Sequence, residues 1–185
     1  MRRILLVVTL AVLVSIAGCS GLGGETTDPS SDDEEPLDPS SDDNSTVDSD
    51  DPMTNATDAN QSIRIEANES VAGSEWESLT VTYPRENFTV DSAQHGDILL
   101  GADTTGDGTA DRTFNETHVS GVNNNDYSFT VELDTEYTLE AGDVIVAEYP
   151  AVDNPAEPGE YTVEVTLNED QTANGTVAIS GNETD

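Results

Sequence analysis

Hydrophobic and polar residues alternate one by one along several stretches in the second part of this chain. In the clearest stretch, Tyr161, Val163, Val165 and Leu167 are separated by single polar residues. A period of two places every apolar side chain on one face of an extended strand, so that this face can pack on a core while the other meets water. No stretch shows a sustained 3.6-residue period of the kind that a helix requires. The pattern therefore predicts an all-β fold.

Eight such strands are expected, and clusters of Gly, Asn, Asp and Pro separate them. The expected strands cover residues 63–65, 79–83, 88–90, 98–102, 127–133, 144–149, 161–167 and 176–179. Seven or eight short strands over this length are typical of a β-sandwich, in which two sheets enclose one core. A domain of this size buries roughly two thirds of its unfolded surface, which is enough to fold without disulfides.

The segment Pro-Gly-Glu-Tyr-Thr-Val at residues 158–163 resembles the start of strand F in immunoglobulin-like domains. In those domains a tyrosine turns the corner into the strand, and its hydroxyl bonds back to the main chain. The resemblance implies an immunoglobulin-like β-sandwich of about seven or eight strands with Tyr161 at that corner. The alternative is that Tyr161 is one more aromatic side chain facing the core.

The N-terminus has the layout of a signal peptide over residues 1–18. Arg2 and Arg3 precede an apolar run from Ile4 to Val14, and small residues follow. The run falls short of the roughly 20 residues that a transmembrane helix needs. We therefore expect export without a lasting membrane span. The paired arginines leave both the twin-arginine and the general secretory routes open.

The only cysteine of the chain, Cys19, directly follows Ile-Ala-Gly at residues 16–18. This segment resembles the lipobox of prokaryotic lipoproteins, in which lipid is attached to the cysteine thiol and the cysteine becomes the new N-terminus. The resemblance implies lipidation of Cys19 and a protein anchored on the extracellular face of the cell membrane. The alternative is a free cysteine near an ordinary cleavage site.

The segment after Cys19 is strongly acidic. Residues 20–60 hold 13 acidic residues and no basic one, and their few apolar side chains cannot build a core. Asp-Pro-Ser-Ser-Asp-Asp occurs at residues 28–33 and again at 38–43, as in low-complexity segments. We expect a lipid-anchored disordered linker over residues 19–60, the β-sandwich domain over 61–181 and a tail over 182–185.

The charge of the whole chain constrains the solvent in which it folds. There are 39 acidic residues, five arginines and no lysine, with a formal net charge of −34. Self-repulsion opposes compaction in dilute buffer, whereas at molar salt the Debye length falls to about 3 Å. Such a surface resembles those of extremely halophilic archaea. Complete disorder is the competing explanation for the charge, although the alternating second part argues against it. Three arginines after residue 60 are too few to hold a nucleic acid.

Asparagine is unusually often followed by the acceptor pattern for N-glycosylation. Eight of the 13 asparagines begin an N-x-[ST] triplet, which exceeds chance and suggests a glycosylated exterior. The candidate sites are Asn44, Asn55, Asn60, Asn68, Asn87, Asn115, Asn174 and Asn182.

Residues 103–111, Asp-Thr-Thr-Gly-Asp-Gly-Thr-Ala-Asp, offer oxygen atoms at alternate positions around a glycine turn. Calcium prefers hard oxygen ligands at this spacing, as in the EF-hand loop. Phe114 stands where that loop has its closing glutamate. The alternative is a solvated acidic hairpin whose glycines adopt positive φ. The candidate metal ligands are Asp103, Thr105, Asp107, Thr109 and Asp111.

The sequence lacks the common catalytic patterns. His95 and His118 are the only histidines, and neither belongs to H-E-x-x-H. No G-x-S-x-G elbow, P-loop or dinucleotide fingerprint occurs. Blue-copper chemistry needs a cysteine thiolate beside two histidines, and lipid on Cys19 removes that thiolate. We expect a protein that is not an enzyme.

Two further stretches are similar to domains of haloarchaeal cell-surface glycoproteins: residues 100–109, and residues 139–146 continuing to 158–161. The chain therefore resembles a haloarchaeal secreted lipoprotein that carries an immunoglobulin-like domain. This resemblance implies a structural or adhesive role at the cell envelope, with envelope proteins or glycans as partners.

Two alternatives can be recognised by their pockets. A lipoprotein that binds sugar or protein, with or without calcium, predicts a concave pocket lined by aromatic rings. The rings to locate are Trp76, Tyr83, Tyr149 and Tyr161. An enzyme predicts a pocket that joins one of the two histidines to a serine and a carboxylate.

Overall fold

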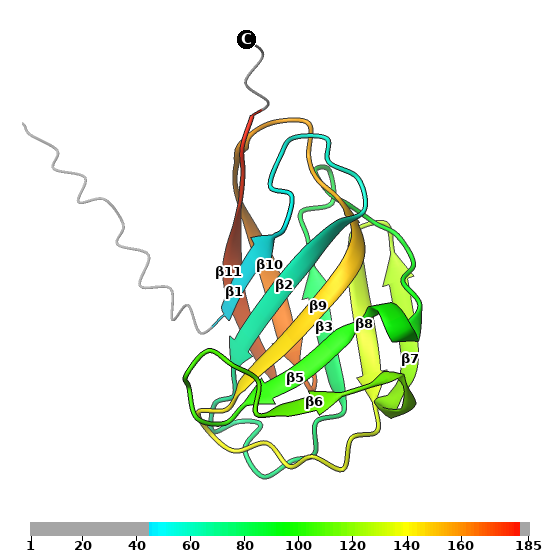
Figure 1. Cartoon of the computed structure of the whole chain (residues 1–185). Coiled ribbons are helices and arrows are strands. Elements are labelled where there is room, and N and C mark those ends of the chain that lie inside the picture. Colours follow the sequence, from blue (N-terminus) through cyan, green and yellow to red (C-terminus); the bar gives the residue numbers. More distant parts are fainter. Residues whose placement is uncertain (1–44, 182–185) are drawn as a thin grey trace, which may run out of the picture. The chain divides into compact units, whose positions relative to one another are not determined.

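The computed structural model describes residues 45–181, which form a sandwich of two antiparallel β-sheets (Figure 1). One sheet has the order β1-β2-β9-β5-β6, with β4 paired to β9, and the other has the order β11-β10-β3-β8-β7. The strands are Ser45–Ser49 (β1), Ala59–Glu66 (β2), Ser78–Thr82 (β3), Thr89–Val90 (β4), Leu99–Asp103 (β5), Arg112–Phe114 (β6), Val119–Asn125 (β7), Ser128–Leu133 (β8), Val144–Asp153 (β9), Gly159–Leu167 (β10) and Gln171–Ile179 (β11). Two short 3-10 helices, His95–Asp97 (η1) and Glu116–His118 (η2), connect strands.

The order of the strands is that of the immunoglobulin fold. Strands β1-β2-β9-β5 correspond to A-B-E-D of that fold, and β11-β10-β3 correspond to G-F-C. Strands β8 and β7 extend the second sheet beyond β3. The predicted all-β, immunoglobulin-like sandwich is therefore confirmed.

The core lies between the sheets, where alternating apolar residues of both meet. In β10, Val163, Val165 and Leu167 are fully buried, whereas the threonine and glutamate between them are not. Aromatic side chains fill the centre, and the rings of Phe129 and Tyr149 stack with their centroids 3.8 Å apart. The period-two pattern thus identified the inward faces of the strands correctly.

Tyr161 forms the corner that its sequence context predicts. Its hydroxyl donates to the main-chain carbonyl of Glu157 over 2.7 Å. Its ring packs edge-on against Phe88, with the centroids 5.3 Å apart. Tyr161 is only partly buried, because it lies where the chain enters β10. The ring also packs against the core, so Tyr161 combines the predicted corner with the core-facing position of the alternative.

Residues 45–60 correct the predicted domain boundary, because they belong to the sandwich and not to a disordered linker. Strand β1 pairs with β2 along its whole length, with Val47 opposite Ile63. Val47 is 1% exposed and lies against Gly175 of β11. One buried valine among polar residues gives almost no period-two signal. The strand could therefore not be predicted from the alternation of apolar and polar residues.

Strands β6 and β7 were also missed. Most of their side chains are exposed, and β7 reads Val-Ser-Gly-Val-Asn-Asn-Asn without regular alternation. Both lie at sheet edges, where pairing on one side holds a strand without a buried face.

No helix within residues 45–181 is long and apolar enough to cross a membrane.

Several predictions concern parts of the chain outside the described residues. These are the signal peptide (1–18), Cys19, the linker up to residue 44, Asn44, Asn182 and the tail (182–185).

Candidate functional site

The predicted calcium loop connects β5 to β6 and is built around the carboxylate of Asp103. Asp103 is the last residue of β5 and is 1% exposed. Its Oδ1 accepts from the main-chain N–H of Thr105 (3.1 Å) and Gly106 (2.7 Å), and its Oδ2 accepts from that of Gly108 (2.7 Å). Gly106 and Gly108 have φ values of +71° and +90°, which let their N–H groups turn inward.

These hydrogen bonds determine the charge state of the loop. Burial alone would raise the pKa of Asp103, but the amides of Gly108, Gly106, Thr105 and Asp107 outweigh it and hold the pKa below its ordinary value. At the other end of the loop, the main-chain amide and hydroxyl of Thr104 lower the pKa of Asp111. Both carboxylates are therefore held as anions by the loop itself.

The hydrogen bonds of this loop fit the acidic-hairpin interpretation better than a loop whose oxygens are free to bind calcium. The hydroxyl of Thr105 also donates to Oδ1 of Asp103, so protein donors occupy about four acceptor positions of this carboxylate. Oδ1 of Asp107 accepts from the N–H of Thr109. Asp103, Asp107 and Asp111 are not among the groups of three or more acidic, histidine or cysteine side chains that converge within residues 45–181. Calcium binding at this loop stays a prediction.

The loop folds back over the outer face of the first sheet. Nη2 of Arg64, on β2, donates to the carbonyl of Gly108 over 3.2 Å. Gly101, on β5, lies so close to Ala110 that a Cβ there would meet the Ala110 Cβ at 2.8 Å. Between loop and sheet remains a hollow of about 280 Å³, open to solvent and bordered by Arg64, Glu66 and Asp103. The Arg64 hydrogen bond and the Gly101–Ala110 contact thus hold the loop against the sheet.

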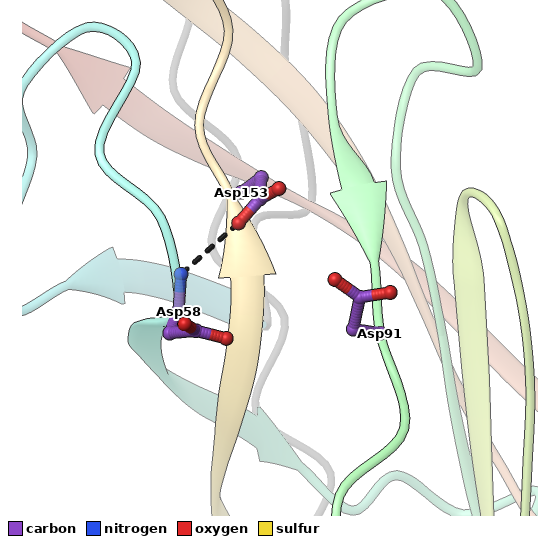
Figure 2. Close-up of side chains that lie close together, drawn as sticks. All are labelled: Asp58, Asp91 and Asp153. Atoms are coloured by element: carbon purple, nitrogen blue, oxygen red, sulfur yellow. Dashed lines mark hydrogen bonds between the residues drawn. The ribbon is translucent and has the colours of Figure 1, made fainter.

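A second acidic group joins three segments at the other end of the sandwich. Asp58 precedes β2, Asp91 follows β4 and Asp153 ends β9, and Figure 2 shows their side chains gathered around β9. One carboxylate oxygen of each lies within 4.8 Å of the others. Oδ1 of Asp153 accepts from the main-chain N–H of Asp58 over 3.0 Å. Sequence reasoning missed this group, because only the folded chain brings its members together.

The two histidines lie in the two short 3-10 helices. His95 is exposed in η1. His118 closes η2, where its Nδ1 lies 3.3 Å from the donating main-chain N of Asn115 and 3.0 Å from the Asn115 Oδ1. Its ring packs edge-on against Phe114. His118 therefore has a structural role as the partner of a capping asparagine.

The aromatic rings that a ligand pocket would need are used elsewhere. Trp76, Tyr83 and Tyr149 are at most 1% exposed and lie in the core. Tyr161 forms the corner described above. Four hollows within residues 45–181 are lined by other side chains, and none of these rings borders them.

The candidate glycosylation sites occupy different environments. Five of them are exposed: Asn55, Asn68, Asn87, Asn115 and Asn174. Asn60 is half-buried within β2.

Comparison with known proteins gives similarity of structure only. No family model and no curated protein matches the sequence. Among solved structures, the bacterial hydrophobin BslA is 17% identical over 74% of this chain and 95% of its own, with a TM-score of 0.41. The N-terminal domain of the Streptococcus gordonii adhesin Sgo0707 is 11% identical over 75% and 33%, with a TM-score of 0.46. An immunoglobulin-like protein from Nocardia farcinica is 13% identical over 74% and 97%, with a TM-score of 0.38. At these identities the likeness concerns the fold alone.

Proposed function

We propose that this protein is a non-enzymatic structural or adhesive module on the cell envelope of a halophilic archaeon, held outside the membrane by lipid on Cys19. The signal-peptide layout and the lipobox-like segment before Cys19 support export and anchoring. The acidic, lysine-free composition supports a saline exterior. The stretch up to residue 44 is proposed as an acidic stalk that spaces the sandwich from the membrane.

The observation that carries the non-enzymatic part is how the fold uses its reactive and aromatic side chains. His118 caps a turn, Asp103 accepts hydrogen bonds from the amides and a hydroxyl of its own loop, and the rings of Trp76 and Tyr149 fill the core. Such a domain offers other molecules its outer surface. This use of the aromatic rings also argues against the sugar-binding alternative, which needs them in a pocket.

Mass spectrometry of the mature N-terminal peptide tests the anchor. We expect lipid on Cys19 and protein in the membrane fraction of cells that export it. Cys19→Ser should lose the lipid and leave the membrane or remain uncleaved, whereas Ser20→Ala, one residue further on, should behave like the wild type. Full-length protein in the cytosol with its leader intact would refute the proposal.

Calcium is a separate proposal for the Asp103 loop. Calorimetric titration of calcium into the protein at molar salt should give one binding site that Asp107→Ala abolishes. Heat and melting temperature unchanged by calcium would leave the loop as a hydrogen-bonded turn.

A further inference from the structure

We infer that the N-x-[ST] triplets differ in how readily they are glycosylated. The folded domain accepts glycan at Asn68 and Asn115 but not at Asn60. The inference rests on the proposed export, because the sugar donor has to meet the domain outside the cytosol. It deepens that proposal by naming the residues through which the envelope sugar would be attached.

Asn68 and Asn115 share a geometry that uses the third residue of their own triplet. Oδ1 of Asn68 accepts from the main-chain N–H of Ser70 (2.8 Å) and from its hydroxyl (2.6 Å). Oδ1 of Asn115 accepts from the N–H of Thr117 (3.0 Å) and from its hydroxyl (2.6 Å). Both asparagines are exposed between strands, and neither Nδ2 donates a hydrogen bond within residues 45–181. The reactive nitrogen of each asparagine is therefore free of hydrogen bonds to the described residues.

This arrangement suits transfer of a sugar from a lipid-linked sugar phosphate. Nδ2 bonds to the anomeric carbon, the bond from that carbon to the phosphate oxygen breaks, and the phosphate leaves with the electron pair. Nδ2 gives up one proton to a base of the transferring enzyme. Hydrogen bonds to Oδ1 draw electron density toward the oxygen and make the Nδ2 protons easier to remove. The Ser70 and Thr117 hydroxyls, which define the triplets, supply those bonds.

Asn60 has the opposite geometry. It lies in β2, at the irregularity between Ala59 and Gln61, where its main-chain N–H donates to Oδ1 of Asp50 and its carbonyl accepts from the N–H of Asp50. Its Nδ2 donates to Oε2 of Glu148 over 3.3 Å, and its Oδ1 is buried with no partner in the described part of the chain. A glycan on Nδ2 would have to displace Glu148 and the side-chain packing around Oδ1. The folded domain therefore excludes this acceptor.

The other exposed triplets provide comparison sites. Asn55, Asn87 and Asn174 are exposed. Within residues 45–181, the hydroxyls of Thr57, Thr89 and Thr176 make no hydrogen bond to the asparagine of their own triplet, unlike those of Ser70 and Thr117. We expect their occupancy to lie between that of Asn68 or Asn115 and that of Asn60.

The test is glycopeptide mass spectrometry of the full chain secreted by an N-glycosylating halophilic archaeal host. We expect most copies to carry glycan at Asn68 and Asn115, and none at Asn60. Ser70→Ala should abolish glycan at Asn68 alone, and Thr117→Ala at Asn115 alone. Ser70→Thr and Thr117→Ser should retain it. Circular dichroism of each variant should confirm that the loss does not come from unfolding.

Two outcomes would overturn the inference. Glycan at Asn60 would mean that the triplets are modified before the strand forms. Asn68 and Asn115 without glycan in exported protein would mean that the transferring enzyme does not favour an asparagine whose Oδ1 is hydrogen-bonded to the third residue of its triplet. Either result leaves the lipid anchor intact, because Cys19 is examined in the same mass spectra. Failure of the anchor would instead appear as uncleaved protein in the cytosol.

Discussion

At the scale of single residues, Tyr161 combines packing with a hydrogen bond. The ring lies against Phe88, and the hydroxyl holds the Glu157 carbonyl. Tyr161→Phe should keep the ring and lose the bond, lowering the free energy of unfolding by about 1 kcal/mol. Tyr127→Phe is the control, since Arg85 lies over the Tyr127 ring and no bond of its hydroxyl is recorded among the described residues. Equal urea midpoints for Tyr161→Phe and the wild type would contradict the role of the corner.

Asp103 makes stability depend on acid pH. Its pKa is lower in the folded than in the unfolded chain, so its contribution is complete above the ordinary value of 3.8 and is lost as the pH falls through the lower folded pKa. We expect Asp103→Asn to melt at a lower temperature than the wild type at neutral pH, with a smaller difference at acid pH. Melting curves across this range measure both.

Asp97→Asn is the control for this experiment, because no side-chain hydrogen bond of the exposed Asp97 is recorded within residues 45–181. A difference between Asp103→Asn and the wild type that stays constant with pH would show that its carboxylate does not contribute through its charge.

Sequence reasoning succeeded at residues whose role is set by their neighbours in the chain. Tyr161 follows Pro-Gly-Glu, and that local context predicts its corner. The gathering of Asp58, Asp91 and Asp153 could not be predicted, because it depends on how β2, β4 and β9 are placed in the sheet. For the Asp103 loop, the sequence left two interpretations open, because donor hydrogen bonds and metal ligation use the same oxygens.

At the scale of elements, β1 is part of the fold although its sequence resembles the acidic linker. Val47→Ala should lower the free energy of unfolding by about 2 kcal/mol, because two buried methyl groups are removed. Thr46→Ala changes the neighbouring exposed side chain and should have little effect. Equal chemical denaturation curves for both variants would mean that β1 adds no stability.

The eight predicted strands all exist, and several extend further than predicted. Their long alternating runs bury one face, which is the signal that sequence carries most clearly. Strand β1 escaped prediction because Val47 is the only apolar side chain on its buried face. Strands β6 and β7 escaped prediction because most of their side chains are exposed. Edge strands of this kind become visible only once their partner is known.

At the scale of the whole molecule, negative charge dominates the surface. Residues 45–181 hold 28 acidic residues against three arginines. Arg64 binds a carbonyl, and Arg85 and Arg112 lie over the rings of Tyr127 and Tyr137 at 4.0 and 5.3 Å. The three arginines therefore contact a carbonyl group and two aromatic rings, and they neutralise few of the carboxylates.

Stability should rise with salt for this reason. Between about 0.1 M and about 1 M sodium chloride the Debye length falls from about 10 Å to about 3 Å, which screens most of the repulsion. We expect the melting temperature to rise over that range and the circular dichroism spectrum to lose strand signal on dilution. Sucrose at equal osmolarity, which stabilises without screening, should raise it less. A fold insensitive to salt would contradict adaptation to a saline exterior.

The placement of β1 has a mechanical consequence. From Ser45 the strand runs toward the end of the sandwich where Met53 bridges Ser180, beside the chain's exit at Gly181 (Figure 1). Tension drawn from Ser45 away from that end pulls along the strand, at right angles to its hydrogen bonds with β2. Those bonds then carry the load together and break in shear, rather than one after another.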